Sequence, residues 1–125
     1  MPMQVKRGEM YYADLNPVIG SEEQGVRPTL IISNNYGNQY SPTVVVAIIT
    51  GQPKKEYLPT HYSLPAENGL EIPSQVLLEQ VRTIDKSRLR EYVGCLDEEA
   101  MQGIDRALAV SVGLEPPPTK LLINN

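Results

Sequence analysis

The sequence predicts a small, strongly bent antiparallel β barrel with one helix packed against it. The chain has 125 residues, which is enough for one domain with a real core and too few for two. About six short segments are rich in β-branched or aromatic residues and are separated by turn-forming residues. One amphipathic segment follows them near the C-terminal end. Strands followed by a single terminal helix favour the barrel with a covering helix.

The predicted strands begin at residues 8–15, GEMYYADL, where tyrosines and apolar residues favour extended structure. Residues 29–33 (TLIIS) and 43–50 (TVVVAIIT) are dense in β-branched residues, as strands buried on both faces are. Further strands are expected at residues 58–64, 75–85 and 90–96.

Two connections between these strands stand out. Residues 16–27, NPVIGSEEQGVR, contain Pro17, Gly20 and Gly25, which interrupt any regular element. This loop is long for a hairpin, and long loops in compact domains are often functional. The segment NNYGNQYSP, residues 34–42, is expected to be a turn-rich connection.

The only strong helix is expected after Asp97, a good N-cap residue that is followed by two glutamates. Gly113 can end the helix in a left-handed conformation. Apolar residues repeat at spacings of three and four and predict one packing stripe: Met101, Ile104, Leu108 and Val112. We expect residues 1–114 to form the domain and residues 115–125 to form a proline-rich, extended tail.

Composition excludes few function classes. No apolar run is long enough to span a membrane and the first residues lack a signal-peptide core, so a cytoplasmic protein is expected. The lone Cys95 is expected to be a buried structural residue. The net charge is −4, but residues 97–125 carry −3 of it, which leaves a locally basic groove possible in residues 1–96.

Most familiar catalytic arrangements are absent from the sequence. We find no phosphate-binding glycine loop, no dinucleotide fingerprint and no Cys/His spacing suited to zinc, so neither a cofactor nor a metal is expected. His61 is the only histidine, so one chain cannot supply a two-histidine acid–base pair. We expect His61 to be a surface residue of a strand rather than a catalyst.

The segment GSEEQGVRP, residues 20–28, resembles the Gly-Ser-Glu-x-x-Gly-x-Arg-Pro signature of the MazF/PemK toxins of bacterial toxin–antitoxin modules. Similar matches occur at VVVAIIT, which ends on Thr50, and at LLEQVRTIDKSRL, residues 77–89. With GEMYYADLNP and the terminal helix, the resemblance extends over about residues 6–114. It implies an SH3-like barrel related to the CcdB toxins and metal-independent cleavage of single-stranded RNA.

The resemblance also implies the site residues. Arg27 and Thr50 match the family's catalytic arginine and threonine, and Glu22 matches its acidic loop residue. Residues expected to line the RNA groove are Ser21, Gln24, Gln80 and Arg82. Without the motif, Arg27, Thr50 and Glu22 would be read as a solvated charge, a strand-end residue and an exposed acid.

The reaction that the resemblance implies is attack of a ribose 2′-hydroxyl on the adjacent phosphate, which leaves a cyclic phosphate and a 5′-hydroxyl, and these residue types fit it. Negative charge develops on the phosphorane oxygens, and the guanidinium of Arg27 offers fixed donors to them, with the Thr50 hydroxyl as a further donor. Arg27 is a poor general base because its pKa lies above about 12. The base is left open, with Glu22 as a weak candidate.

Two other functions fit the sequence less well. A CcdB-like poison of DNA gyrase relies on a C-terminal tryptophan, and this chain has no tryptophan. A peptide-binding SH3-like module needs an aromatic groove, and the chain has neither Trp nor Phe. The resemblance further implies a homodimer and an antitoxin, similar to MazE, that inhibits the RNase by occupying its groove.

Overall fold

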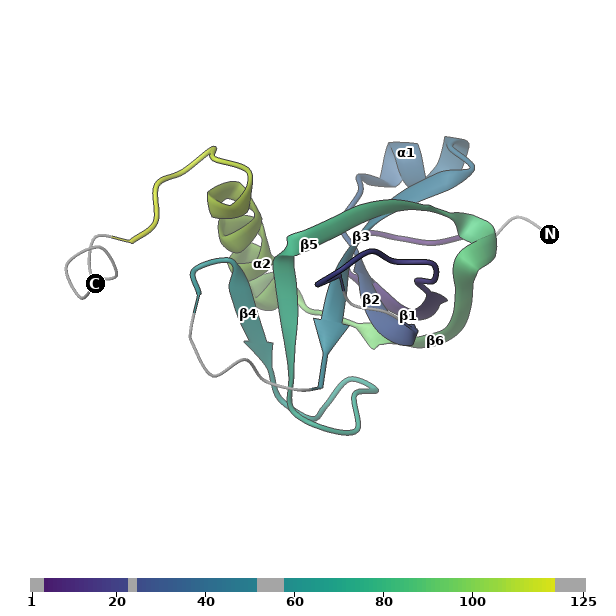
Figure 1. The fold of residues 1–125 in the computed structure, drawn as a ribbon, viewed down its shortest axis with the longest axis horizontal. Coiled ribbons are helices and arrows are strands. Elements are labelled where there is room, and N and C mark those ends of the chain that lie inside the picture. The colour runs from purple at the N-terminus through teal and green to yellow at the C-terminus, as the bar shows by residue number, and fades with distance from the viewer. Residues whose placement is uncertain (1–3, 23–24, 52–57, 119–125) are drawn as a thin grey trace.

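The computed structural model describes residues 4–22, 25–51 and 58–118, and these form one six-stranded antiparallel sheet with a helix at its side (Figure 1). The strand order is β4-β5-β3-β2-β1-β6. The strands are β1 (Glu9–Asp14), β2 (Val26–Ile31), β3 (Thr43–Thr50), β4 (His61–Leu64), β5 (Ser74–Asp85) and β6 (Leu89–Cys95). The helices are α1 (Asn35–Tyr40), a 3-10 turn η1 (Lys86–Arg88) and α2 (Glu98–Ser111). The predicted fold class, mainly β with a C-terminal helix, is confirmed.

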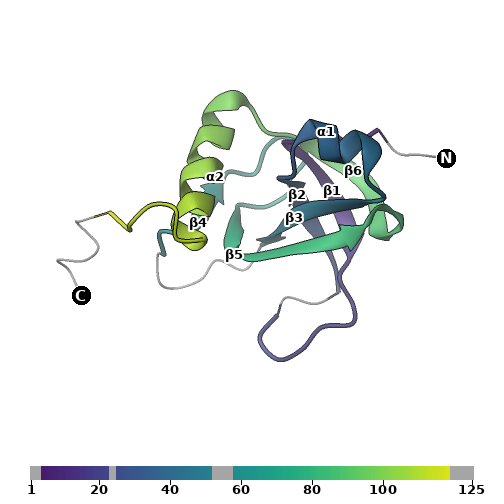
Figure 2. The same ribbon diagram turned by 90° about the horizontal axis from the view of Figure 1, so that it is seen from above.

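The sheet curls so that its two faces bury two separate hydrophobic clusters. One cluster lies between the sheet and α2 and includes Leu30, Ile49, Leu78 and Ile104. The other is enclosed by the curled strands and includes Ile31 and Val46 from neighbouring strands. Figure 2 shows α2 at one side of the molecule and the curled strands at the other. Strands buried on both faces explain the dense β-branched composition of β3.

An irregularity in β5 bends this long strand. Ala47 of β3 is paired with Val81, but the next residue, Ile48, is paired with Leu77, so residues 78–80 of β5 have no counterpart in β3. The backbone N–H of Leu78 instead donates to the carbonyl oxygen of Thr60 at 2.8 Å. Extra residues on one strand of a pair sharpen its bend, and they redirect the side chains at that point. The bend is visible in Figure 1.

The turn between β4 and β5 packs directly on the edge strand β6. A Cβ atom added to Gly69 would lie 1.8 Å from the carbonyl oxygen of Val93, and one added to Gly94 would lie 1.8 Å from that of Asn68. Gly69 also has a φ of +97°, which side chains rarely allow. Glycine at both positions lets two backbones touch, and the contact covers part of an otherwise exposed strand edge.

Helix α2 begins as predicted, because the Asp97 side chain accepts a hydrogen bond from the N–H of Ala100 at 2.8 Å. It ends before Gly113, whose φ is +80°. The predicted apolar stripe is wrong at its last member, since Val112 is 58% exposed. The buried face instead includes Gly103, where an added Cβ would lie 2.1 Å from the ring of Tyr62.

Three further expectations are wrong. Residues 35–40 form helix α1 rather than only turns; the Asn34 side chain caps it by accepting from the N–H of Gly37 at 2.8 Å. Cys95 is exposed, because it lies on the edge strand β6. His61 is in a strand, as expected, but it is buried, because β4 is paired with β5 and is also contacted by α2.

Candidate functional site

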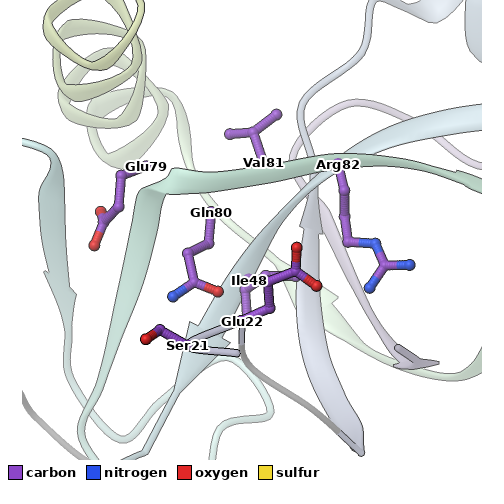
Figure 3. A pocket seen from close by; sticks show the side chains of 7 residues that line it. All are labelled: Ser21, Glu22, Ile48, Glu79, Gln80, Val81 and Arg82. Atoms are coloured by element: carbon purple, nitrogen blue, oxygen red, sulfur yellow. The ribbon is translucent and has the colours of Figure 1, made fainter. Parts of the chain in front are cut away.

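A pocket of about 470 Å³ opens beside the bend of β5 (Figure 3). Its described lining comes from the loop between β1 and β2, from β3 and from the bent part of β5. The lining residues are Ser21, Glu22, Ile48, Glu79, Gln80, Val81 and Arg82. Four of the residues predicted from the sequence, Ser21, Glu22, Gln80 and Arg82, are therefore brought together at one place.

The irregularity in β5 explains why consecutive residues of this strand reach the pocket. In a regular strand, side chains alternate between the two faces. Glu79 and Gln80 lie in the stretch that is not paired with β3, and both side chains extend toward the same side of the strand in Figure 3, whereas Val81 points away from them. The bend thus places a carboxylate and an amide next to each other.

The described part of the loop between β1 and β2 contains hydrogen bonds of its own beside the pocket. The N–H of Ile19 donates to Oε1 of Glu22 at 2.8 Å, and the N–H of Glu22 donates to the carbonyl oxygen of Ile19 at 3.2 Å. At the base of the loop, the N–H of Leu15 donates to the carbonyl oxygen of Gly25 at 3.0 Å. Glu22 therefore has a structural role in shaping the loop in addition to the role implied by its motif.

Two arginines, one in β5 and one in the 3-10 turn η1, also support this loop. Nη1 of Arg82 donates to the carbonyl oxygen of Leu15 at 2.8 Å. Nη1 of Arg88 donates to the carbonyl oxygens of Asp14 at 3.1 Å and of Asn16 at 2.5 Å. Both guanidinium groups thus bring positive charge to the start of the loop.

Arg27 and Thr50 lie on the same face of the sheet as the pocket, although neither is among its described lining residues. Thr29 of β2 is paired with Ile48 of β3, a pocket residue. Because side chains alternate along a strand, Arg27 shares the face of Thr29, and Thr50 shares the face of Ile48. Continued by two residues, the same register puts Arg27 opposite Thr50. Arg27 is half-buried and Thr50 is 1% exposed.

Sequence reasoning missed Glu79 and its partners. Oε2 of Glu79 lies 2.8 Å from Nε2 of His61, and Oε1 accepts a hydrogen bond from Oγ1 of Thr60 at 3.0 Å. No sequence signal pointed to this cluster, because it depends on how β4 aligns with the bend of β5. The remaining predicted groove residue, Gln24, lies outside the described residues.

Two further findings concern metal binding and membrane insertion. Within residues 4–22, 25–51 and 58–118, no group of three or more His, Cys, Asp or Glu side chains is arranged to hold a metal ion. In that same part of the chain, no helix has the length and apolar character needed to cross a membrane.

The fold and site together define a small single-domain protein, a bent barrel with a pocket lined by arginine, amide, hydroxyl and carboxyl side chains that can donate and accept hydrogen bonds. Residues 6–112 match the family described as PemK-like, MazF-like toxins of type II toxin–antitoxin systems, and the chain belongs to this family. The resemblance found in the sequence motifs is thereby confirmed.

Individual relatives agree with this assignment. The chain is 53% identical over 113 residues to a protein of Bacillus subtilis (strain 168) named Endoribonuclease EndoA, and the match covers 90% of this chain and 97% of that protein. A solved mycobacterial endoribonuclease in complex with its cognate antitoxin is similar in structure, with a TM-score of 0.75 and 28% identity. The match covers 90% of this chain and 99% of that one. MazF of Deinococcus radiodurans, at 24% identity, shares the fold with a TM-score of 0.77. The match covers 89% of this chain and 98% of that one.

Proposed function

We propose that this toxin cleaves single-stranded messenger RNA at specific sequences, without a metal ion, and thereby inhibits translation and growth. The chain is an endoribonuclease of the type II toxin family, by its family match and by its 53% identity to the Bacillus enzyme. The proposal is supported above all by the pocket, which joins Ser21 and Glu22 of one loop to Gln80 and Arg82 of a distant strand.

In the proposed reaction the 2′-hydroxyl of one ribose attacks the adjacent phosphorus. The bond from phosphorus to the 5′-oxygen of the next nucleotide breaks, which leaves a 2′,3′-cyclic phosphate and a 5′-hydroxyl. Arg27 stabilises the charge on the phosphorane oxygens and donates a proton to the leaving oxygen, and Thr50 adds a hydroxyl donor. The position of both residues on the pocket's face of the sheet supports these roles.

Glu22 is the proposed base that takes the proton of the 2′-hydroxyl. Because its Oε1 accepts the N–H of Ile19, the proton would pass to Oε2. Arg82 would contact a phosphate, and Ser21, Gln24 and Gln80 would contact the nucleotides in the groove. Hydrogen-bonding side chains of this kind are suited to unstacked single strands, whose base edges are accessible.

The test is to incubate the pure protein with a long transcript, with and without EDTA, and to map the 5′ ends of the products. The proposal expects discrete fragments with 5′-hydroxyl ends, in equal amounts in both reactions. A gyrase poison or a peptide-binding module would leave the RNA intact.

We also propose a cytoplasmic homodimer whose two subunits border one RNA groove, controlled by an antitoxin similar to MazE. The antitoxin's flexible acidic segment would occupy the phosphate-binding residues near Arg27 and Arg82. Light scattering at micromolar concentration is expected to give twice the monomer mass of 13.9 kDa. Titration of the antitoxin against the toxin and an uncleavable RNA should displace the RNA, and a stable ternary complex with unchanged RNA affinity would contradict the shared groove.

A further inference from the structure

We propose that Glu79 determines base specificity by accepting a hydrogen bond from the amino group of one RNA base, so that the pocket at the bend of β5 favours adenine, cytosine or guanine over uracil. The proposal rests on the proposed RNA cleavage and adds to it a base-reading residue. The residue enters the pocket only because of the irregular pairing of β5.

The carboxylate of Glu79 is held in a fixed orientation. Thr60 donates to Oε1 at 3.0 Å, and His61 contacts Oε2 at 2.8 Å. An ionised carboxylate only accepts hydrogen bonds, so Nε2 of His61 carries the proton in this contact. The His61 side chain is 1% exposed and cannot change position easily, whereas the Glu79 side chain remains 36% exposed at the pocket.

The carboxylate of Glu79 can still accept hydrogen bonds from a ligand. Two carboxylate oxygens offer about four acceptor positions in total. One position on each oxygen is used by Thr60 and His61. The remaining positions can accept N–H groups, and the group is preorganised for this because its geometry is already fixed on the protein side.

Charge decides which part of the RNA faces Glu79. A phosphate would be repelled by the carboxylate, whereas the amino group of a base would be attracted, and pairing of Glu with an amino group such as N4 of cytosine is a known mode of readout. Adenine, cytosine and guanine each have an exocyclic amino group. Uracil presents a single N–H between two carbonyl oxygens, and those oxygens would be repelled. Arg82, which lines the same pocket as Glu79, supplies positive charge for the phosphates of the RNA backbone.

The experiment measures base preference one position at a time. The recognition sequence is first mapped on a long transcript, and short RNAs are then made in which each position in turn carries all four bases. The wild-type protein is expected to show one position where an amino-bearing base is preferred to uracil by roughly tenfold to a hundredfold in kcat/KM.

Glu79→Gln replaces the charged acceptor by an amide that can both donate and accept, and is expected to reduce that one preference to within about threefold while preferences at the other positions stay unchanged. Thr60→Val removes one of the two supporting hydrogen bonds and is expected to weaken the same preference partially. Glu91→Gln, on the exposed surface of β6, is the matched control and should change no preference. If Glu79→Gln cleaves too slowly to measure, the same comparison is made by binding of RNAs with 2′-fluoro substitution at the cleavage site.

Three outcomes are distinguishable. If the wild-type protein cuts no RNA, the proposed function itself is wrong. If it cuts but Glu79→Gln lowers the rate equally for all bases at every position, Glu79 contacts a ribose hydroxyl or supports the fold, and the inference is overturned while the proposed function stands. Loss of preference at one position alone supports the inference.

Discussion

Arg82 in the middle of β5 donates a hydrogen bond from Nη1 to the carbonyl oxygen of Leu15, 2.8 Å away, at the point where β1 gives way to the loop that carries Ser21 and Glu22. The residue was predicted from the sequence as an RNA contact. The structure gives it a contact with the loop as well, and the two roles can be separated by experiment.

The first prediction concerns these two roles of Arg82. Replacing it by Ala should lower kcat/KM by roughly tenfold or more, mainly through KM, because a charged hydrogen bond is lost. If Arg82 also neutralises a phosphate, the slope of log K against log salt should fall by about 0.7, as for single-stranded RNA. The measurements are cleavage kinetics and RNA binding at several salt concentrations.

Arg82→Lys separates the contributions, since it keeps the charge but lacks the planar guanidinium. It should restore the salt slope without restoring the slow hydrogen exchange of the Leu15 N–H, which bonds to Gly25 across the base of the loop. Arg106→Ala, at an exposed position of α2, is the control. An Arg82→Ala variant with an unchanged loop and an unchanged salt slope would contradict both roles.

The second prediction concerns stability at high pH. Burial raises the pKa of Tyr11 to about 12, with help from the hydrogen bond to Glu9 at 3.0 Å. The folded state therefore keeps this proton while the unfolded chain loses it near pH 10, so the contribution is complete below pH 10 and is lost as pH rises toward 12. The loss should amount to roughly 2–3 kcal/mol of the free energy of unfolding.

Urea unfolding at pH 7 to 11.5 measures this effect. Tyr11→Phe keeps the ring that contacts Tyr92, whose centroid is 5.5 Å away, but it has no proton to lose. The variant should be less stable than wild type by about 1 kcal/mol at pH 7 and should show a weaker decline above pH 10. Parallel pH curves for the two proteins would show that Tyr11 is not the responsible group.

The third prediction concerns the close contact of the β4–β5 turn with β6. Gly69→Ala should lower the free energy of unfolding by about 3 kcal/mol or more, because the new Cβ would overlap the carbonyl of Val93 and the backbone has a positive φ. Gly113→Ala is the matched control, with a positive φ but open space around it, and should cost about 1 kcal/mol. Equal losses in the two variants would mean that φ alone, and not the contact, makes Gly69 necessary.

The sequence allowed the strands and the terminal helix to be predicted because their signals are local. The predicted and observed spans of β3 are the same, since TVVVAIIT is dense in β-branched residues, and α2 begins at the predicted cap. Helix α1 was missed because polar contacts replace an apolar stripe: Asn38, its buried residue, donates to the carbonyl oxygen of Ser33 at 2.9 Å. Such a helix has no apolar stripe, so hydrophobic periodicity does not predict it.

The candidate site was predictable only where residues lie in motifs. Ser21, Glu22, Gln80 and Arg82 were found through motif resemblance, and they line one pocket. Glu79 was missed because its position depends on the irregular pairing of β5, and the buried state of His61 depends on α2 and β5 packing around a short strand. Both the position of Glu79 and the burial of His61 depend on contacts between distant segments, which local sequence patterns do not predict.

The central claim is metal-independent RNA cleavage with Arg27 as the chief donor to the phosphate. Its most direct test is the cleavage rate of one mapped RNA by wild type, Arg27→Ala and Thr50→Val in the presence of EDTA, with circular dichroism to verify the fold. The account predicts full wild-type activity with EDTA, 5′-hydroxyl products, a loss of at least about a hundredfold (more than about 2.7 kcal/mol) for Arg27→Ala, and a smaller loss for Thr50→Val. Near-normal turnover by a folded Arg27→Ala variant, or activity abolished by EDTA, would contradict it.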